Sequence, residues 1–234
     1  MRPPEQAEKD ERLFYWADEE YMVGQQLVTQ TGLYGPDLEE AVTIGSMAQD
    51  HLGYAYQLLK HLVSSEDRAI DRYVYERSPE EYHLGLLAQA WDPSDWALIV
   101  AKEYLYDSVC FVRAQDLKES DSMFSGLAEM MLRETDFRIR HWREWLRTLG
   151  NLSEGRERVN KALAFVLPMA QQSLTLRDGR GRWFESCVEE LEAAGYAIPN
   201  PIGFPTVSGV LSTTRELLED AHGYYRTHPE WVWG

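Results

Sequence analysis

Four carboxylic acids lie within stretches of the sequence that otherwise carry apolar residues at helical spacing. These acids are Glu20, Asp50, Glu103 and Glu134, and each belongs to a different stretch. A carboxylate buried without a partner takes up a proton instead of staying charged. Each acid therefore requires a metal ion, a cationic side chain or a second acid close by, and the kind of partner decides which chemistry the protein can perform.

Glu134 lies in the stretch with the clearest period, between Leu127 and Gly150. Steps of three or four residues select one stripe: Leu127, Met130, Met131, Glu134, Phe137, Arg138, His141, Trp145 and Leu149. This stripe predicts a long helix with Glu134 in the middle of its apolar face. Arg138 follows at the i, i+4 spacing that favours an ion pair, so its guanidinium could neutralise Glu134 where a metal would otherwise bind.

Helical bundles that bind two iron or manganese ions need a comparable set of acids. They take a carboxylate from each of two helices and a Glu-x-x-His pair from each of the other two. In this sequence Phe137 stands three residues after Glu134, and Gly53 stands three residues after Asp50. His51 directly follows Asp50 and is expected to point about 100° away from it around the helix. The nitrogen ligands that an oxygen-activating site prefers are therefore missing at the required spacing.

Two interpretations of the four acids stay open. In the first, they form a metal-free polar layer of a bundle, and the chain carries no cofactor. In the second, they hold a di-iron or di-manganese centre in a carboxylate oxidase or monooxygenase, with Tyr54, four residues after Asp50, as an unusual ligand. A homo-oligomeric helical protein of another purpose is a third hypothesis. The common nucleotide, zinc-protease and hydrolase motifs do not occur.

Helices must position these acids, because the sequence shows helical periods, no alternating strand pattern and no repeat. The expected helices cover residues of about 8–30, 36–63, 67–76, 95–117, 120–150, 153–176, 183–194 and 212–225. Four of them are long, so the sequence predicts an all-α protein with a four-helix bundle as its core. We expect one domain over residues 1–234, with the bundle at about 8–150 and additional C-terminal helices and a tail at 151–234.

The first two expected helices have apolar stripes of their own. The first stripe consists of Leu13, Trp16, Ala17, Glu20, Gly24 and Leu27, and the second of Leu38, Val42, Gly45, Leu52 and Leu59. Small residues in the second helix, among them Ala48 and Ala55, allow a neighbouring helix to approach closely. In the third long helix, at about 95–117, one stripe consists of Trp96, Ile99, Glu103, Asp107, Cys110 and Ala114.

Composition restricts the possible partners. The chain has 39 acidic against 23 basic residues and a net charge of −16, which repels nucleic acid and anionic membranes. Cys110 and Cys187 are far apart in sequence and indicate neither a disulfide framework nor a thiolate metal site. With no apolar run of membrane-spanning length and a charged, proline-containing N-terminus, we expect a soluble, cytoplasmic protein.

Two further segments could bind something. The turn RDGRGR at 177–182 could hold an anion, although such cationic turns are more often solvated loops. The last four residues, WVWG, contain Trp231 and Trp233, and a tryptophan-rich tail tends to dock on its own subunit or on a partner.

Four segments follow one another in an order that is more specific than any one of them: ADEEYMVGQQL, GPDLEEAVTIGSMAQDHLGYAYQLLKHL, DPSDWALIVAKEYLYDS and RETDFRIRHWREWLRTLGN. In this order they resemble the C subunit of ring-1,2-phenylacetyl-CoA epoxidase, a multicomponent oxygenase of phenylacetate degradation. The resemblance covers roughly Leu13 to Leu167 and fades toward the C-terminus.

The resemblance implies a ferritin-like fold and a structural role in aromatic degradation. In that family the C subunit is a metal-free homologue that scaffolds an A subunit, and the A subunit holds the di-iron centre and binds the CoA thioester. A homologous catalytic A-type subunit is thus the implied partner, in a hetero-oligomer. The degenerate site would comprise Glu20, Asp50, Tyr54, Glu103, Glu134, Phe137 and Arg138. Phe137 and Arg138 depart from the tyrosine-histidine pair of the familiar C subunits.

Overall fold

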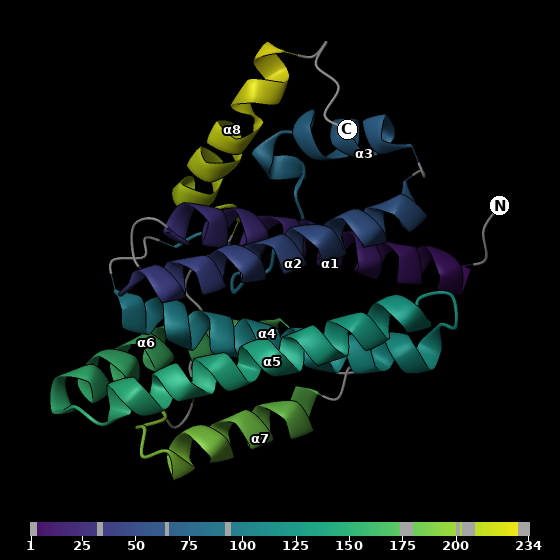
Figure 1. Cartoon of the computed structure of the whole chain (residues 1–234). Coiled ribbons are helices and arrows are strands. Elements are labelled where there is room, and N and C mark those ends of the chain that lie inside the picture. The colour runs from purple at the N-terminus through teal and green to yellow at the C-terminus, as the bar shows by residue number, and fades with distance from the viewer. Residues whose placement is uncertain are drawn as a thin grey trace. The chain divides into compact units, whose positions relative to one another are not determined.

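The computed structural model describes residues 4–31, 35–63, 66–91, 95–173, 180–199, 202 and 209–228. The regular elements in these ranges are all helices, as Figure 1 shows, which confirms the all-α prediction. The chain divides into two compact units, the first with residues 1–84, 88–92 and 209–234 and the second with 85–87 and 93–208. That residues 1–234 form a single domain stays a prediction.

The first unit is built on two long antiparallel helices, α1 (Pro4–Thr31) and α2 (Leu38–Leu62), as seen in Figure 1. Asp37 begins α2, since its side chain accepts a 2.8 Å hydrogen bond from the backbone N–H of Glu40. Three shorter elements complete the unit: α3 (Asp67–Tyr75), the 3₁₀ turn η1 (Pro79–Glu81) and α8 (Ser212–Thr227).

Helices α1 and α2 approach each other closely at Gly24. A Cβ atom there would lie 2.7 Å from Cγ of Leu52 and 3.2 Å from the backbone oxygen of Ala48. Both distances are shorter than ordinary contacts in a packed interior, so a larger residue would push the helices apart. Ala48 is fully buried at this contact, as expected from the small residues of α2.

The buried face expected from the sequence is correct for α1 but not for the first turns of α2. On α1, the expected stripe from Leu13 to Leu27 is buried throughout, Glu20 included. On α2, the expected stripe is wrong in its first turns, because Leu38 and Val42 are 76% and 66% exposed. The buried face instead contains Ile44, Met47, His51, Tyr54, Ala55 and Leu58. Both sets have helical spacing, so periodicity alone did not distinguish them.

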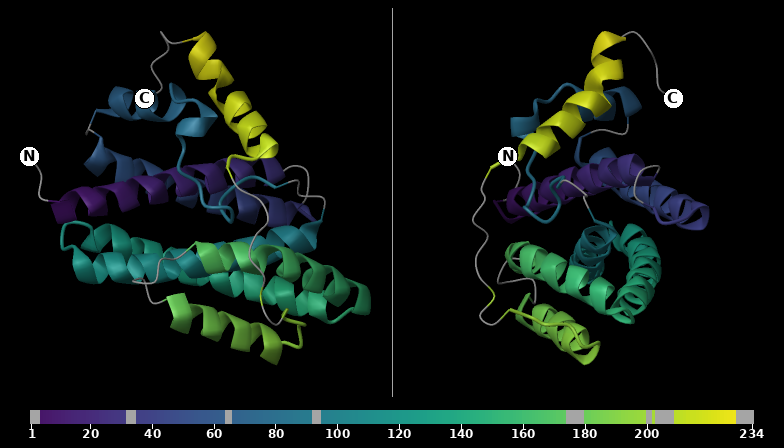
Figure 2. Two further views of the ribbon diagram at one scale, coloured as in Figure 1. Left: turned by 180° about the vertical axis from the view of Figure 1, so that it is seen from behind. Right: turned by 90° about the vertical axis from the view of Figure 1, so that its left-hand side faces the viewer.

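The second unit consists of four helices: α4 (Trp96–Ser120), α5 (Ser125–Gly150), α6 (Ser153–Gln172) and α7 (Arg180–Ala193). Figure 2 shows them from two further sides. Asp95 begins α4 by accepting a 2.8 Å hydrogen bond from the backbone N–H of Ala97. Because α4 contacts each of the other three helices, residues 99–110 are buried on every side of it. A charged residue in this segment therefore needs a partner in the protein interior.

The buried face of α5 is turned by about one position from the expected stripe. The buried residues are Ala128, Met131, Thr135, Arg138, Ile139, Trp142, Leu146 and Gly150. Glu134 is only half-buried, and Phe137 is 59% exposed. The expectation that a carboxylate stands in the middle of this apolar face is thus wrong. The buried ionisable residue of α5 is the cation Arg138.

Some expected features fall outside the described residues. These are most of the turn at 177–182, of which the structure describes only the backbone of 180–182, and the tail from 229 to 234 with both of its tryptophans. Cys110 and Cys187 are buried thiols. Within the described ranges, the structure has no helix that is both long enough and apolar enough to cross a membrane.

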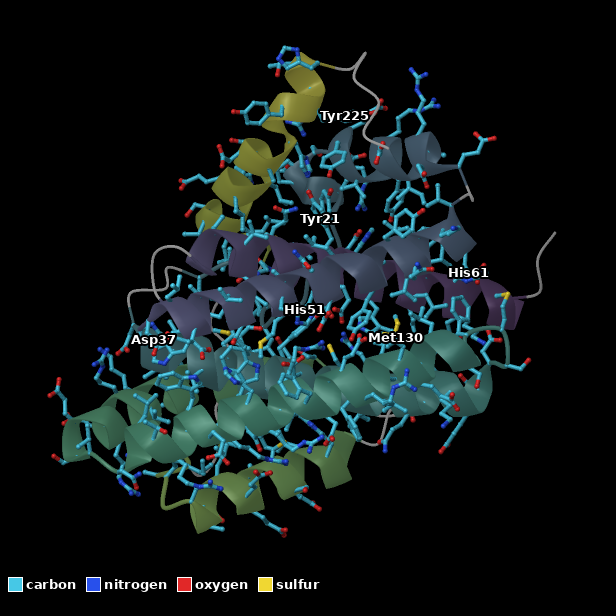
Figure 3. All side chains as sticks on the ribbon, viewed as in Figure 1. Tyr21, Asp37, His51, His61, Met130 and Tyr225 are labelled. Atoms are coloured by element: carbon cyan, nitrogen blue, oxygen red, sulfur yellow. The ribbon has the colours of Figure 1, made fainter. Side chains whose placement is uncertain are left out.

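Helix α8 is joined to the rest of the first unit by an aromatic cluster around His222. The imidazole lies 5.5–6.1 Å, between ring centroids, from Tyr21, Tyr75 and Tyr82, and its Nε2 lies 3.3 Å from the Tyr82 hydroxyl. Figure 3 labels Tyr21, on the side of α1 that faces α3 and α8. Burial and the positive charges of Arg226 and Arg77 lower the pKa of His222 to about 4.

This pKa predicts a loss of stability in mild acid. An unfolded histidine titrates near pH 6.5, so between about 6.5 and 4 the unfolded chain binds a proton that the folded chain does not. We expect His222 to lower the free energy of unfolding by on the order of 2 kcal/mol between pH 7 and pH 5. Urea titrations of wild type and His222→Gln at both pH values measure this change in the free energy of unfolding. The exposed control His61→Gln should keep the wild-type difference, and an unchanged difference in His222→Gln would contradict the assignment.

Candidate functional site

In the first unit, the expected acid Glu20 is fully buried on α1 and faces α2. Its Oε2 lies 2.5 Å from Nδ1 of His51, and its Oε1 accepts a 2.7 Å hydrogen bond from the indole N–H of Trp16. Both ring systems are buried. Two nitrogen groups of the protein therefore occupy the two oxygens of this carboxylate.

His51, rather than its neighbour Asp50, is the inward residue at this turn of α2. His51 is fully buried and Asp50 is half-buried, and Figure 3 labels His51 midway along the helix. His51 thus reaches Glu20 on the neighbouring helix, a contact that the Glu-x-x-His spacing did not predict. The sequence does contain the signal, since steps of three and four residues from Met47 lead to His51 and Tyr54. Tyr54 is buried as well, with its ring centroid 6.2 Å from that of His51.

In the second unit, Arg138 of α5 forms a buried ion pair with Asp107 of α4. The guanidinium donates from Nε to Asp107 Oδ1 at 2.8 Å and from NH2 to the Thr135 hydroxyl at 3.0 Å. The other oxygen of Asp107 accepts a 2.9 Å hydrogen bond from the indole N–H of Trp142. All four side chains are buried. The sequence placed Asp107 in phase with the apolar stripe of α4, but its charge partner was not expected.

Glu103, one turn before Asp107, is paired within its own helix. Lys102 is buried, and its ammonium group lies 2.9 Å from Glu103 Oε1. The second oxygen, Oε2, is buried without a hydrogen-bond partner among the described residues. Residues 103 and 107 lie on one face of α4 because they are four apart. Two carboxylates and two cations, Lys102 and Arg138, thus balance in the interior of the unit.

The first unit has a second buried acid with a cationic partner. Asp18 is 1% exposed and binds Arg77 through both oxygens, at 2.5 and 3.0 Å. The Arg77 guanidinium lies 3.9 Å from the ring centroids of both Tyr73 and Tyr82, between which it is held. This pair connects α1 to the segment between α3 and η1. Sequence reasoning missed it, since Arg77 is an isolated residue in an irregular stretch.

These contacts decide whether the side chains suit a di-metal centre. In the described part of the chain, no three His, Cys, Asp or Glu side chains are grouped so that they could hold a metal ion. Glu20, Asp107 and Glu103 each accept from a nitrogen group of the protein. A di-iron or di-manganese site is therefore not a fit to the residues as they stand. The pairing of Glu134 with Arg138 stays a prediction, as does the lack of a cofactor.

These observations define a class of protein. It is all-helical, and its buried carboxylates contact basic side chains of the same chain. The comparison with known families is more specific. The model of the phenylacetic acid catabolic protein family, which combines the A and C types, matches residues 2–201, and the chain belongs to this family. Membership of this family gives the chain a ferritin-like helical fold and a connection to phenylacetate catabolism. No curated protein matches the chain.

The buried pair in the second unit predicts a strong effect of Arg138→Met on stability. Loss of the cation leaves Asp107 buried and uncompensated, which we expect to lower the free energy of unfolding by about 3–5 kcal/mol. Urea denaturation measures this loss.

The double variant Arg138→Met with Asp107→Leu is the matched control. Removing both charges should restore most of the lost stability, because neither residue is then an unpaired charge. Arg140→Met, at an exposed position of the same helix, should change the free energy of unfolding by less than about 0.5 kcal/mol. An equal loss in the single and double variants would show that packing, not charge, is responsible.

Proposed function

We propose that this chain is the non-catalytic scaffold subunit of a multicomponent di-iron monooxygenase or epoxidase that acts on an aryl-CoA such as phenylacetyl-CoA. It would pair in the cytoplasm with a homologous A-type subunit that carries the iron and binds the thioester. The family match supports a role in phenylacetate catabolism. The choice of the scaffold type over the catalytic type depends on the interior of the chain itself.

The observation that carries this proposal is the pairing of Asp107 with Arg138 next to the pairing of Glu103 with Lys102. Di-iron relatives use inward carboxylates to bind two metal ions. Here the positive charge beside Asp107 and Glu103 comes from a guanidinium and an ammonium group that are covalently part of the chain. A metal ion bound among these acids would place its positive charge beside the buried guanidinium and ammonium groups, which would repel it.

The chemical consequence is that the acids support structure instead of catalysis. Guanidinium and ammonium groups neutralise carboxylates but supply no redox chemistry, so oxygen activation must take place on another chain. A subunit of this kind contributes surface and rigidity to its partner.

Metal analysis combined with co-expression tests this function. The chain is expressed with iron and manganese in the medium, alone and together with an A-type subunit, and purified without chelator. We expect metal far below stoichiometric amounts in the chain alone, and a stable complex whose iron belongs to the A-type subunit. Mass spectrometry of metals and size-exclusion chromatography give the two readouts.

One variant and one control protein make the result decisive. Glu20→Gln should leave the metal content of the isolated chain at its low level, because Glu20 is engaged by His51 and Trp16. A di-iron protein of another family serves as the negative control for complex formation. Two transition-metal ions per chain that are lost in Glu20→Gln would favour the oxidase alternative, and failure to bind any A-type subunit would reject the scaffold role.

A further inference from the structure

A pocket of about 310 Å³ lies in the second unit where α5 and α7 end and α6 begins. Its lining residues are Tyr104, Arg143, Leu146, Arg147, Gly150, Asn151, Arg156, Glu190, Leu191, Ala194 and Tyr196. Three of these are arginines, and one is a carboxylate. In a chain with a net charge of −16, this local excess of positive charge is unusual.

Arg156 carries a charge that no carboxylate of the pocket neutralises. Its guanidinium donates to the backbone oxygens of Gly150 at 2.6 Å and Gly195 at 2.7 Å. Gly195 has φ +84°, and a Cβ atom there would lie 2.4 Å from Arg156 NH1, so this approach requires glycine. The carbonyl oxygens at the ends of α5 and α7 hold the guanidinium in place and offset part of its charge, but they bring no formal negative charge to the pocket.

Arg147 is held only weakly. Its partner Glu144 is three residues away on α5, outside the pocket lining, and both side chains are about two-thirds exposed, at 69% and 65%. Exposed pairs of this kind contribute little stability, so Arg147 can turn to another anion at small cost.

Arg143 and Tyr104 show how the pocket binds a carboxylate. Glu190 accepts a 2.7 Å hydrogen bond from Arg143 NH2 and one of 3.0 Å from the Tyr104 hydroxyl. Burial, with the nearby Cys187 and Glu190, raises the pKa of Tyr104, which keeps the phenol protonated as a donor. Glu190 thus occupies one oxyanion position of the pocket, while Arg147 and Arg156 surround the remaining space.

The other walls are apolar. Leu146 and Leu191 are buried beside the pocket, and the Tyr196 ring lies 5.8 Å from the Arg156 guanidinium. A volume of 310 Å³ is in the range of pockets that hold small molecules. A ligand that matches both features has one anionic end and a compact apolar body.

We propose that this pocket binds a small organic oxyanion, a carboxylate or phosphate monoester with an apolar body, through Arg147 and Arg156. The site is separate from the buried ion pairs and does not depend on the scaffold role. Glu190 keeps Arg143 and the Tyr104 hydroxyl engaged, and its negative charge opposes the binding of a second anion in the same pocket.

Isothermal titration calorimetry on the full chain tests the proposal with four probes: acetate, benzoate, inorganic phosphate and phenyl phosphate. We expect benzoate to bind more tightly than acetate, and phenyl phosphate more tightly than phosphate, because the apolar walls contact the ring. Comparison of the two pairs also shows whether a carboxylate or a phosphate is preferred.

Two substitutions should move the affinity in opposite directions. Arg147→Gln should weaken the binding of the better aromatic probe about tenfold, as expected for one charged hydrogen-bonding group. Glu190→Gln should strengthen it several-fold, because the substitution removes a negative charge that repels an anion in the pocket.

Arg140→Gln is the matched control, since Arg140 is an exposed arginine of α5 paired with Asp136 and lies outside the pocket lining. It removes the same charge and should leave the affinity within about twofold of wild type. Absence of binding of all four probes at millimolar concentration would overturn the proposal. So would an equal effect of Arg147→Gln and Arg140→Gln, which would indicate only non-specific attraction to the surface.

Discussion

The buried ion pair between Asp107 and Arg138 is the interaction on which the second unit depends. In a low-dielectric interior, neither charge is tolerable alone, so both must be fully engaged. Thr135 and Trp142 supply the additional hydrogen bonds, and both stand on α5 with Arg138. The pair therefore fixes the register of α5 against α4. A shift of either helix by one residue would leave a carboxylate and a guanidinium buried apart.

The same requirement shapes the chemistry. A bundle interior with inward carboxylates can neutralise them with metal ions, or it can contain cations of its own. In this chain Glu20 lies against His51, Glu103 against Lys102 and Asp107 against Arg138. Each of these acids thus has a contact inside the protein. These contacts are the basis on which we propose a structural role for this member of the phenylacetic acid catabolic family.

The pocket of α5, α6 and α7 follows a different rule. Its arginines lie near the surface, where solvent lowers the penalty of an unmatched charge. Arg156 is positioned by backbone carbonyls rather than by a carboxylate, and Glu190 accounts for only part of the positive charge. The ion pairs of the core thus contain acids and bases in equal number, whereas the pocket has an excess of arginines. Side chains of the first kind stabilise the fold, and those of the second kind can bind a ligand.

The sequence by itself determined the helices, their bounds to within a few residues, and the presence of ionisable residues among apolar ones. Helical periodicity and capping residues such as Asp37 and Asp95 are local, so they are readable without the fold. Only the tertiary structure decided which ionisable residue faces inward. On α5, the expected stripe contained both Glu134 and Arg138, and only the packing showed that Arg138 is buried while Glu134 is half-buried. The partner of Arg138 is 31 residues away, on another helix, and no pattern within one helix could identify it.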